Sequence, residues 1–130
     1  MKTMKIANNE ILVKPKALYP IKRKDRLKIC TAEGIYIINK AEILYLNSQS
    51  NYCRLFMKNG VRVMCSSTLK YFEEKLPQHF LRVHQSYIVN TEHLSFVAGN
   101  YTAVHIHDHK IPVSRSQKDQ LKAFIERYID

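Results

Sequence analysis

The residues best suited to recognise another molecule lie in the C-terminal half of the sequence. Arg115 follows an apolar run and stands at the start of an expected helix. A guanidinium there could fork onto O6 and N7 of guanine, and the first N–H groups of the helix would favour a phosphate. Gln85 and Ser86 separate two apolar runs, where an amide could pair with adenine and a hydroxyl could reach a phosphate. The competing interpretations are a surface ion pair of Arg115 with Asp119 and simple solvation of Gln85 and Ser86.

A second candidate site consists of His105, His107 and His109. Alternation along a strand would place three imidazoles on one side, at a spacing that could bind zinc or copper. However, Asp108-His109 resembles a hairpin turn, which would break the alternation, and no cysteine or carboxylate completes a ligand set. The sequence therefore favours a protein without a metal or other cofactor.

Catalytic motifs are missing from the sequence. It has only three glycines and shows no glycine-rich phosphate loop, nucleophile elbow or paired carboxylates. Cys30, Cys53 and Cys65 are odd in number and form no Cys-x-x-Cys pair, which indicates free thiols in a reducing cytoplasm. No secretion signal and no apolar run of membrane-spanning length is evident. We therefore expect a cytoplasmic protein that is not an enzyme and does not enter a membrane.

The charge of the chain suggests an anionic partner, since the formal net charge is +10. Residues 1–28 carry nine basic and two acidic side chains, whereas the remaining residues carry twelve basic and nine acidic ones. Residues 1–24, which include Pro15 and Pro20, are expected to form a basic arm or linker. Such an arm could be a solvated tail, a phosphate-gripping extension or a connection to another domain.

The elements that must position these residues are mostly short strands, expected from residue 25 onward in one domain, 25–130. Glu33-Gly34 and Asn59-Gly60 are turn pairs, and the second tolerates the positive φ values of a two-residue hairpin turn. Cys53, Leu55 and Met57 would share one face of a strand. The expected strands are Arg26–Thr31, Ile35–Asn39, Ile43–Asn47, Tyr52–Met57, Val61–Cys65, Phe80–Val83, Tyr87–Val89, His93–Val97, Thr102–His107 and Lys110–Val113.

Two helices are also expected. Ser67 or Thr68 could cap a short central helix that Pro77 ends. A C-terminal helix could begin with a capping box, formed either by Ser116 with Asp119 or by Ser114 with Gln117. Its apolar stripe indicates packing against the core and consists of Leu121, Phe124, Ile125 and Tyr128. The fold class expected is mainly β with a minor helical part.

Several blocks together resemble the LytTR family, the DNA-binding domain of LytR-, AlgR- and AgrA-type response regulators in two-component systems. The resemblance covers roughly residues 25–130. Its most specific blocks are Phe80–Asn90 and Ile111–Arg115 at the appropriate distance, and it also includes Ile43–Leu46, Asn51-Tyr52 and Thr68–Pro77.

The resemblance implies small antiparallel β-sheets stacked side by side, with DNA bound through loops that enter successive major grooves. It implies a bacterial transcriptional regulator acting on a direct-repeat promoter site in double-stranded DNA, with a second copy of the chain and RNA polymerase as further partners. Arg115 and Gln85 would contact bases, as would Cys53, although burial of that thiol is the alternative. The phosphate contacts would be Ser86, Arg54, Asn51, Tyr52, Ser116 and Lys118.

His84 and Arg82 are expected to be structural and to orient the loop that carries Gln85. The chain could also be a protein-interaction module whose strand edges bind a partner and which has lost DNA contact. Residues 1–24 are too few for a receiver domain. The chain could therefore stand alone as a regulator or be the effector half of a longer protein.

Overall fold

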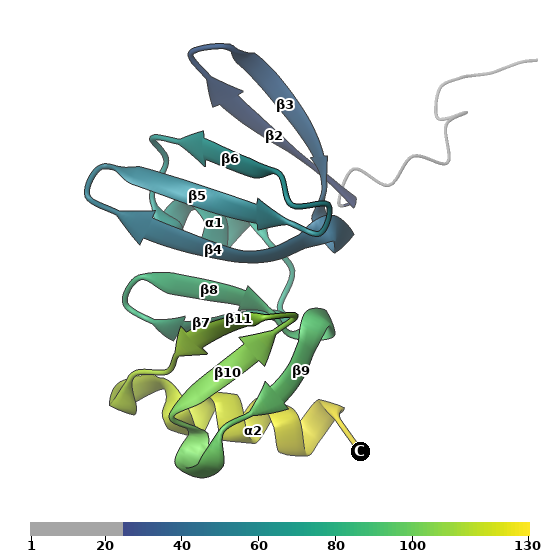
Figure 1. The fold of residues 1–130 in the computed structure, drawn as a ribbon, viewed down its shortest axis with the longest axis vertical. Coiled ribbons are helices and arrows are strands. Elements are labelled where there is room, and N and C mark those ends of the chain that lie inside the picture. Colours follow the sequence, from purple (N-terminus) through teal and green to yellow (C-terminus); the bar gives the residue numbers. More distant parts are fainter. Residues whose placement is uncertain (1–24) are drawn as a thin grey trace, which may run out of the picture.

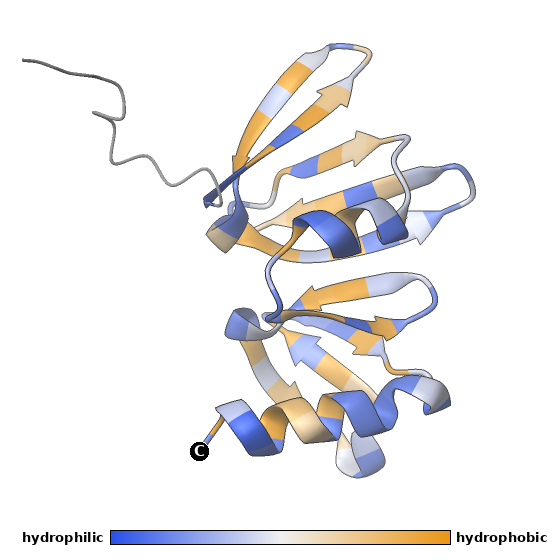
Figure 2. Ribbon diagram, turned by 180° about the vertical axis from the view of Figure 1, so that it is seen from behind, coloured by the Kyte–Doolittle hydropathy of each residue, from blue (hydrophilic) through white to orange (hydrophobic). Residues whose placement is uncertain are grey.

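The computed structural model describes residues 25–130 (Figure 1). The basic arm expected at residues 1–24 lies outside the described residues. The described part contains three antiparallel sheets and two helices, so the mainly β fold class is confirmed. Figure 2 shows hydrophobic and hydrophilic bands alternating along many of the strands, as expected where one face of a sheet packs on a core.

The first sheet is a hairpin of β2 (Arg26–Thr31) and β3 (Gly34–Asn39), with Gly34 at φ 146°. The hairpin predicted here is present, but its turn is Ala32-Glu33, one residue before the predicted pair Glu33-Gly34, because Gly34 pairs with Thr31 as the first residue of β3. Leu27, Ile29 and Ile38 are buried, whereas Ile35 and Ile37 are exposed on the other face. The hairpin covers the core with one face only.

The central sheet has five strands in the order β6-β5-β4-β8-β7. Alternate residues of these strands pack into two different clusters, so that Leu46 and Ile88 lie on one face of the sheet and Tyr45 and Val89 on the other. The sheet is therefore buried on both faces. Its strands are β4 (Ile43–Gln49), β5 (Tyr52–Met57), β6 (Arg62–Cys65), β7 (Phe80–His84) and β8 (Tyr87–Asn90).

The turn between β5 and β6 differs from the predicted two-residue turn. The N–H of Gly60 donates to the carbonyl of Met57 (3.0 Å), and the N–H of Met57 donates to the carbonyl of Val61 (2.9 Å). Only Gly60 of the Asn59-Gly60 pair has a positive φ, of 89°. The connection is thus a three-residue loop with a glycine bulge. Consequently β6 begins at Arg62, and Val61, the first residue of the expected strand, is exposed.

Helix α1 (Leu69–Lys75) covers the face of the central sheet that carries Leu46. Thr68 is its N-cap, and its side chain accepts from the N–H of Tyr71 at 3.1 Å. This confirms the second of the two predicted caps. Leu69 and Phe72 are buried, and the helix ends at Lys75, with Leu76 as its C-cap directly before Pro77.

The third sheet contains β9 (Leu94–Val97), β10 (Ala103–Ile106) and β11 (His109–Pro112). The prediction placed the β10–β11 turn at Asp108-His109, but Ile106 pairs with His109, so the turn is His107-Asp108. His107 has φ 53°, a conformation that histidine, like asparagine and aspartate, adopts more readily than most residues.

Helix α2 (Lys118–Tyr128) follows a turn of 3-10 helix, Arg115–Gln117, and covers the other face of the central sheet together with the third sheet. Neither predicted capping box forms, because neither the 3-10 turn nor α2 has a side-chain hydrogen bond at its N-cap. Instead, the Ser114 and Ser116 hydroxyls lie 3.3 Å apart. The predicted stripe is confirmed for Leu121, which is fully buried, and for Phe124 and Ile125, which are partly buried against the same cluster, but not at its end, where Tyr128 is 60% exposed.

Candidate nucleic-acid interface

Three turns lie together at one edge of the domain, on the left in Figure 1 and on the right in Figure 2. They are the β4–β5 turn, the β7–β8 turn and the turn that leads into α2. The N–H of Ser48 donates to the carbonyl of Ser86 (2.9 Å), and the Asn47 amide donates to the same oxygen (3.2 Å). The N–H of Ser114 donates to the carbonyl of Val83 at 2.9 Å. Backbone hydrogen bonds therefore fix both outer turns to the middle one.

The middle turn carries Gln85, whose side chain is exposed. The side chain of Arg82 on β7 stabilises the backbone of this turn. The Arg82 guanidinium donates to the carbonyls of His84 (3.0 Å) and Gln85 (2.6 Å) and to the carboxylate of Glu73 on α1 (2.8 Å). The Arg82 side chain is only 24% exposed. A charged donor with three acceptors holds this turn in one geometry, so Gln85 projects from a fixed backbone.

The imidazole of His84 also stabilises this turn. Its Nδ1 accepts a hydrogen bond from the N–H of Ser86 at 3.0 Å, which requires that Nδ1 carry no proton. The imidazole also packs against the ring of Tyr87, with centroids 5.6 Å apart. The orienting role predicted for His84 and Arg82 thus agrees with their hydrogen bonds.

Arg115 lies at the first position of the 3-10 turn before α2, and its side chain is exposed. No ion pair joins it to Asp119; within residues 25–130 the ion pairs involve His79, Arg82 and His109. The alternative of a surface ion pair is therefore wrong for this structure. Ser116 is exposed and Lys118 half-buried in the same segment.

The β4–β5 turn consists of Ser50, at φ 53°, and the exposed Asn51. Tyr52, the first residue of β5, is 54% exposed. Arg54 is half-buried and its guanidinium donates to the side-chain oxygen of Gln49 on the neighbouring strand. Asn51 and Tyr52 are thus free to touch a ligand, whereas Arg54 is partly engaged within the sheet.

Cys53 does not belong to this surface. Its side chain is fully buried on the face of β5 that also carries Leu55. Burial raises the pKa of the Cys53 thiol to about 12, with a further increase from Cys65 and an opposing effect of Arg82. The expectation that Cys53 contacts a base therefore does not fit the structure, and the alternative of burial is correct.

A polar hollow of about 530 Å³ adjoins the β4–β5 turn and extends to the segment before α1. Its walls include the serines Ser48, Ser50, Ser66 and Ser67, and both Lys70 and Arg82 line it. Ser66, Ser67 and Lys70 were not among the predicted contact residues, because nothing in a single sequence indicates that this segment folds back beside the β4–β5 turn.

The three histidines of the candidate metal site do not converge. His105 packs on Phe96, His107 packs on His93, and the Nδ1 of His109 lies 3.1 Å from the Tyr45 hydroxyl. Within the described part of the chain, no group of three or more metal-ligating side chains is found. Neither of the two helices there has the length and apolar character needed to cross a bilayer.

Comparisons with known proteins point to one family. The sequence is 30% identical to the sensory transduction protein LytT of Bacillus subtilis over 105 residues, which cover 77% of this chain and 43% of that protein. It is 32% identical over 95 residues, 63% of this chain and 39% of the other, to the transcriptional regulatory protein LytR of Staphylococcus aureus. The chain thus spans less than half the length of these relatives.

The fold matches a solved structure, the LytTr DNA-binding domain of a putative methyl-accepting/DNA response regulator from Bacillus cereus. The TM-score is 0.62 at 20% identity, over 78% of this chain and 94% of that one. A sequence model of the LytTr DNA-binding domain matches residues 33–126, a range that includes all three turns of the edge described above. The chain therefore belongs to the LytTr family of DNA-binding domains.

Proposed function

We propose that the row of three turns binds double-stranded DNA in a sequence-specific manner, with Arg115 and Gln85 as the residues that read bases. The observation that carries this proposal is the placement of the two side chains, exposed on adjacent turns whose backbones are hydrogen-bonded into one rigid edge. A guanidinium and an amide each form two parallel hydrogen bonds to a purine edge in the major groove, so they suit guanine and adenine respectively.

Phosphate contacts would come from the polar groups that surround these two readers. Ser86 adjoins Gln85, and Ser116 and Lys118 adjoin Arg115 along the same edge. Asn51 and Tyr52 extend this surface on the β4–β5 turn, with Arg54 reaching it once it releases Gln49. Ser66, Ser67 and Lys70 add hydroxyl and ammonium donors in the polar hollow. Donors on both sides of the readers would fix the register of the domain on the duplex.

At the level of the whole protein, we propose a bacterial transcription regulator of the two-component type that acts in the cytoplasm, with residues 25–130 as its DNA-binding domain. The names of the related proteins support this proposal, as does the share of their length that the chain covers. Binding to a direct-repeat promoter site would bring a second copy beside the first and place both near RNA polymerase.

The test is in-vitro selection of bound duplexes from a random library with the purified chain. Enrichment of one sequence, in two repeats with fixed spacing, is the expected result. Bound duplexes with no enriched sequence would leave only nonspecific binding, and the assignment of Arg115 and Gln85 as readers would be wrong. Absence of binding to any duplex at low salt would favour a protein-interaction module instead.

A further inference from the structure

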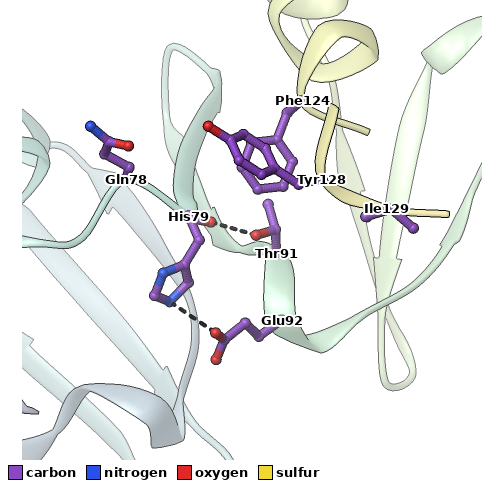
Figure 3. Close-up of a pocket in the computed structure, with 7 residues that line it drawn as sticks. All are labelled: Gln78, His79, Thr91, Glu92, Phe124, Tyr128 and Ile129. Atoms are coloured by element: carbon purple, nitrogen blue, oxygen red, sulfur yellow. Dashed lines mark hydrogen bonds and ion pairs between the residues drawn. The ribbon is translucent and has the colours of Figure 1, made fainter. Parts of the chain in front are cut away.

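A cavity lies at the opposite end of the domain from the DNA-facing turns. It has a volume of about 520 Å³ and is lined by Gln78, His79, Thr91, Glu92, Phe124, Tyr128 and Ile129 (Figure 3). Gln78 and His79 precede β7 and Thr91 and Glu92 follow β8, so all four lie at the ends of these strands away from Gln85. A volume of this size is typical of sites for small organic ligands.

One wall of the cavity is apolar and aromatic. Phe124 and Tyr128 stand four residues apart on α2, and their ring centroids lie 4.8 Å from each other. Tyr128 is 60% and Ile129 47% exposed, so packing of the core does not account for either side chain. The guanidinium carbon of Arg127 lies 5.6 Å from the centroid of the Tyr128 ring. Although this cation already lies beside the ring, Tyr128 remains 60% exposed, so a flat ligand can still reach it.

The opposite wall is acidic. The Glu92 carboxylate lies 3.9 Å from Nε2 of His79, and its side chain is 62% exposed. None of the seven lining residues is a lysine or arginine, although the chain contains 21 of them. The cavity thus combines an aromatic wall with a carboxylate whose nearby partner among the lining residues is the His79 imidazole, a cation only when protonated.

The backbone that carries Glu92 is firmly held. The Asn90 side chain is fully buried; its oxygen accepts from the N–H of Glu92 (3.0 Å) and its amide donates to the carbonyl of Ile43 (2.9 Å). The carbonyl of His79 accepts from both the N–H (3.1 Å) and the hydroxyl (2.7 Å) of Thr91. A ligand would therefore meet a preformed site, which lowers the entropic cost of binding.

We propose that this cavity binds an aromatic cation, with a flat ring against Phe124 and Tyr128 and a positively charged amidinium, guanidinium or ammonium group on Glu92. An anionic ligand is disfavoured by the carboxylate, so the cavity is not an extension of the DNA surface. The cation could be a free small molecule or an aromatic side chain beside a basic one in a peptide. Because the cavity and Arg115 lie at opposite ends of α2, both sites could be occupied at once.

The experiment is a titration of the whole chain with benzamidine, followed by amide chemical shifts. Saturable shifts are expected at Thr91, Glu92 and Tyr128, and benzamide, the neutral analogue, should bind more weakly. Glu92→Gln should weaken benzamidine binding by about two- to fivefold, the range expected for an exposed charge pair. Glu74→Gln, which removes an exposed carboxylate on α1 outside the cavity, should have no effect, while Tyr128→Ala should weaken binding of both compounds.

A capped Phe-Arg dipeptide that shifts the same amides would identify a peptide source for the same chemistry. Three results would overturn the proposal: no saturable shift at the cavity with benzamidine, equal affinity for benzamide and benzamidine, or unchanged affinity in both Glu92→Gln and Tyr128→Ala. Since neither substituted residue is near the three turns, DNA binding of the two variants should be normal and serves as the check that they are folded.

Discussion

The backbone N–H of Ser48 donates a 2.9 Å hydrogen bond to the carbonyl oxygen of Ser86. Ser48 belongs to β4, and Ser86 lies in the turn directly before β8, where the ladder between these strands ends. The bond therefore extends the pairing of the two strands into the β7–β8 turn. Asn47 donates to the same oxygen, which leaves the turn little freedom to move relative to the sheet. The surface proposed to bind DNA is thus a continuation of the central sheet.

Arg115→Ala should reduce affinity for the selected duplex by about 1–3 kcal/mol and relax preference at one G·C pair, because a bidentate contact is lost only where the correct base is present. Gln85→Ala should act in the same way at an A·T pair and more weakly, because a neutral amide forms weaker bonds than a guanidinium. Competition binding to the selected site and to its single-base-pair variants measures both. Equal weakening on every duplex would mean that these side chains hold the backbone and do not read bases.

Lys118→Ala should weaken specific and nonspecific duplexes alike, since a phosphate contact carries no sequence information. With about five to seven phosphate contacts, the slope of log K against log salt should be roughly −4 to −6, and the variant should reduce its magnitude by about one. Binding at several salt concentrations gives the slope. A slope near zero at measurable affinity would contradict the electrostatic part of the proposal, and an unchanged slope in the variant would remove Lys118 from the contact set.

Arg82→Lys should impair base reading without removing a base contact. A lysine cannot reproduce the three hydrogen bonds to His84, Gln85 and Glu73, so the turn should lose its fixed geometry at a stability cost of about 1–3 kcal/mol. We expect the variant to lose preference at the same base pair as Gln85→Ala, and the double variant to lose no more preference than Gln85→Ala alone.

The control for this prediction is Arg26→Lys, which makes the same change at an exposed position on β2 and should leave DNA preference intact. If Arg82→Lys lowers affinity for all duplexes equally, the guanidinium contacts phosphate and is not a brace. Denaturant unfolding of each variant, measured in parallel, shows how much of any loss in binding comes from lower stability.

Cys53 should make the domain sensitive to alkaline pH. Its pKa is about 12 in the folded chain against an ordinary value of 9.0, so above pH 9 the unfolded state loses a proton that the folded state retains. The free energy of unfolding should therefore fall by about 1.4 kcal/mol per pH unit from pH 9 until the folded pKa is reached. Cys53→Ala should remove this part of the pH dependence. The measurement is the difference in pH slope between the two proteins, since the alanine also lowers stability at every pH; parallel slopes would contradict the assignment.

The sequence predicted most elements of the fold because their signals are local. Thr68 and Pro77 bound α1 as expected, and alternation located β5. The errors occur where a local pattern permits two outcomes. Asn59-Gly60 suits both a two-residue turn and a three-residue loop with a bulge, and the second moved Val61 out of the strand. At the start of α2, the 3-10 turn from Arg115 satisfies backbone groups that a capping box would otherwise serve.

The site was predictable in part only. Gln85 and Arg115 stand in loops that the sequence indicates, and the structure places both on one edge. The residues that hold them there depend on tertiary contacts: Glu73 reaches Arg82 from another element, and Asn47 reaches Ser86 from another strand. Cys53 shows the reverse case, because its alternation with Leu55 indicated burial while the position in the family block indicated contact with DNA.

The central sheet separates two clusters of buried residues, and each cluster needs one of its faces. Leu46 and Ile88 serve the cluster beneath α1 and the β2–β3 hairpin, while Tyr45 and Val89, their neighbours on the same strands, serve the cluster beneath α2. Loss of either covering layer would expose a face of strands that the other layer still requires. The described domain should therefore melt in one cooperative transition, without an intermediate in which only one half is folded.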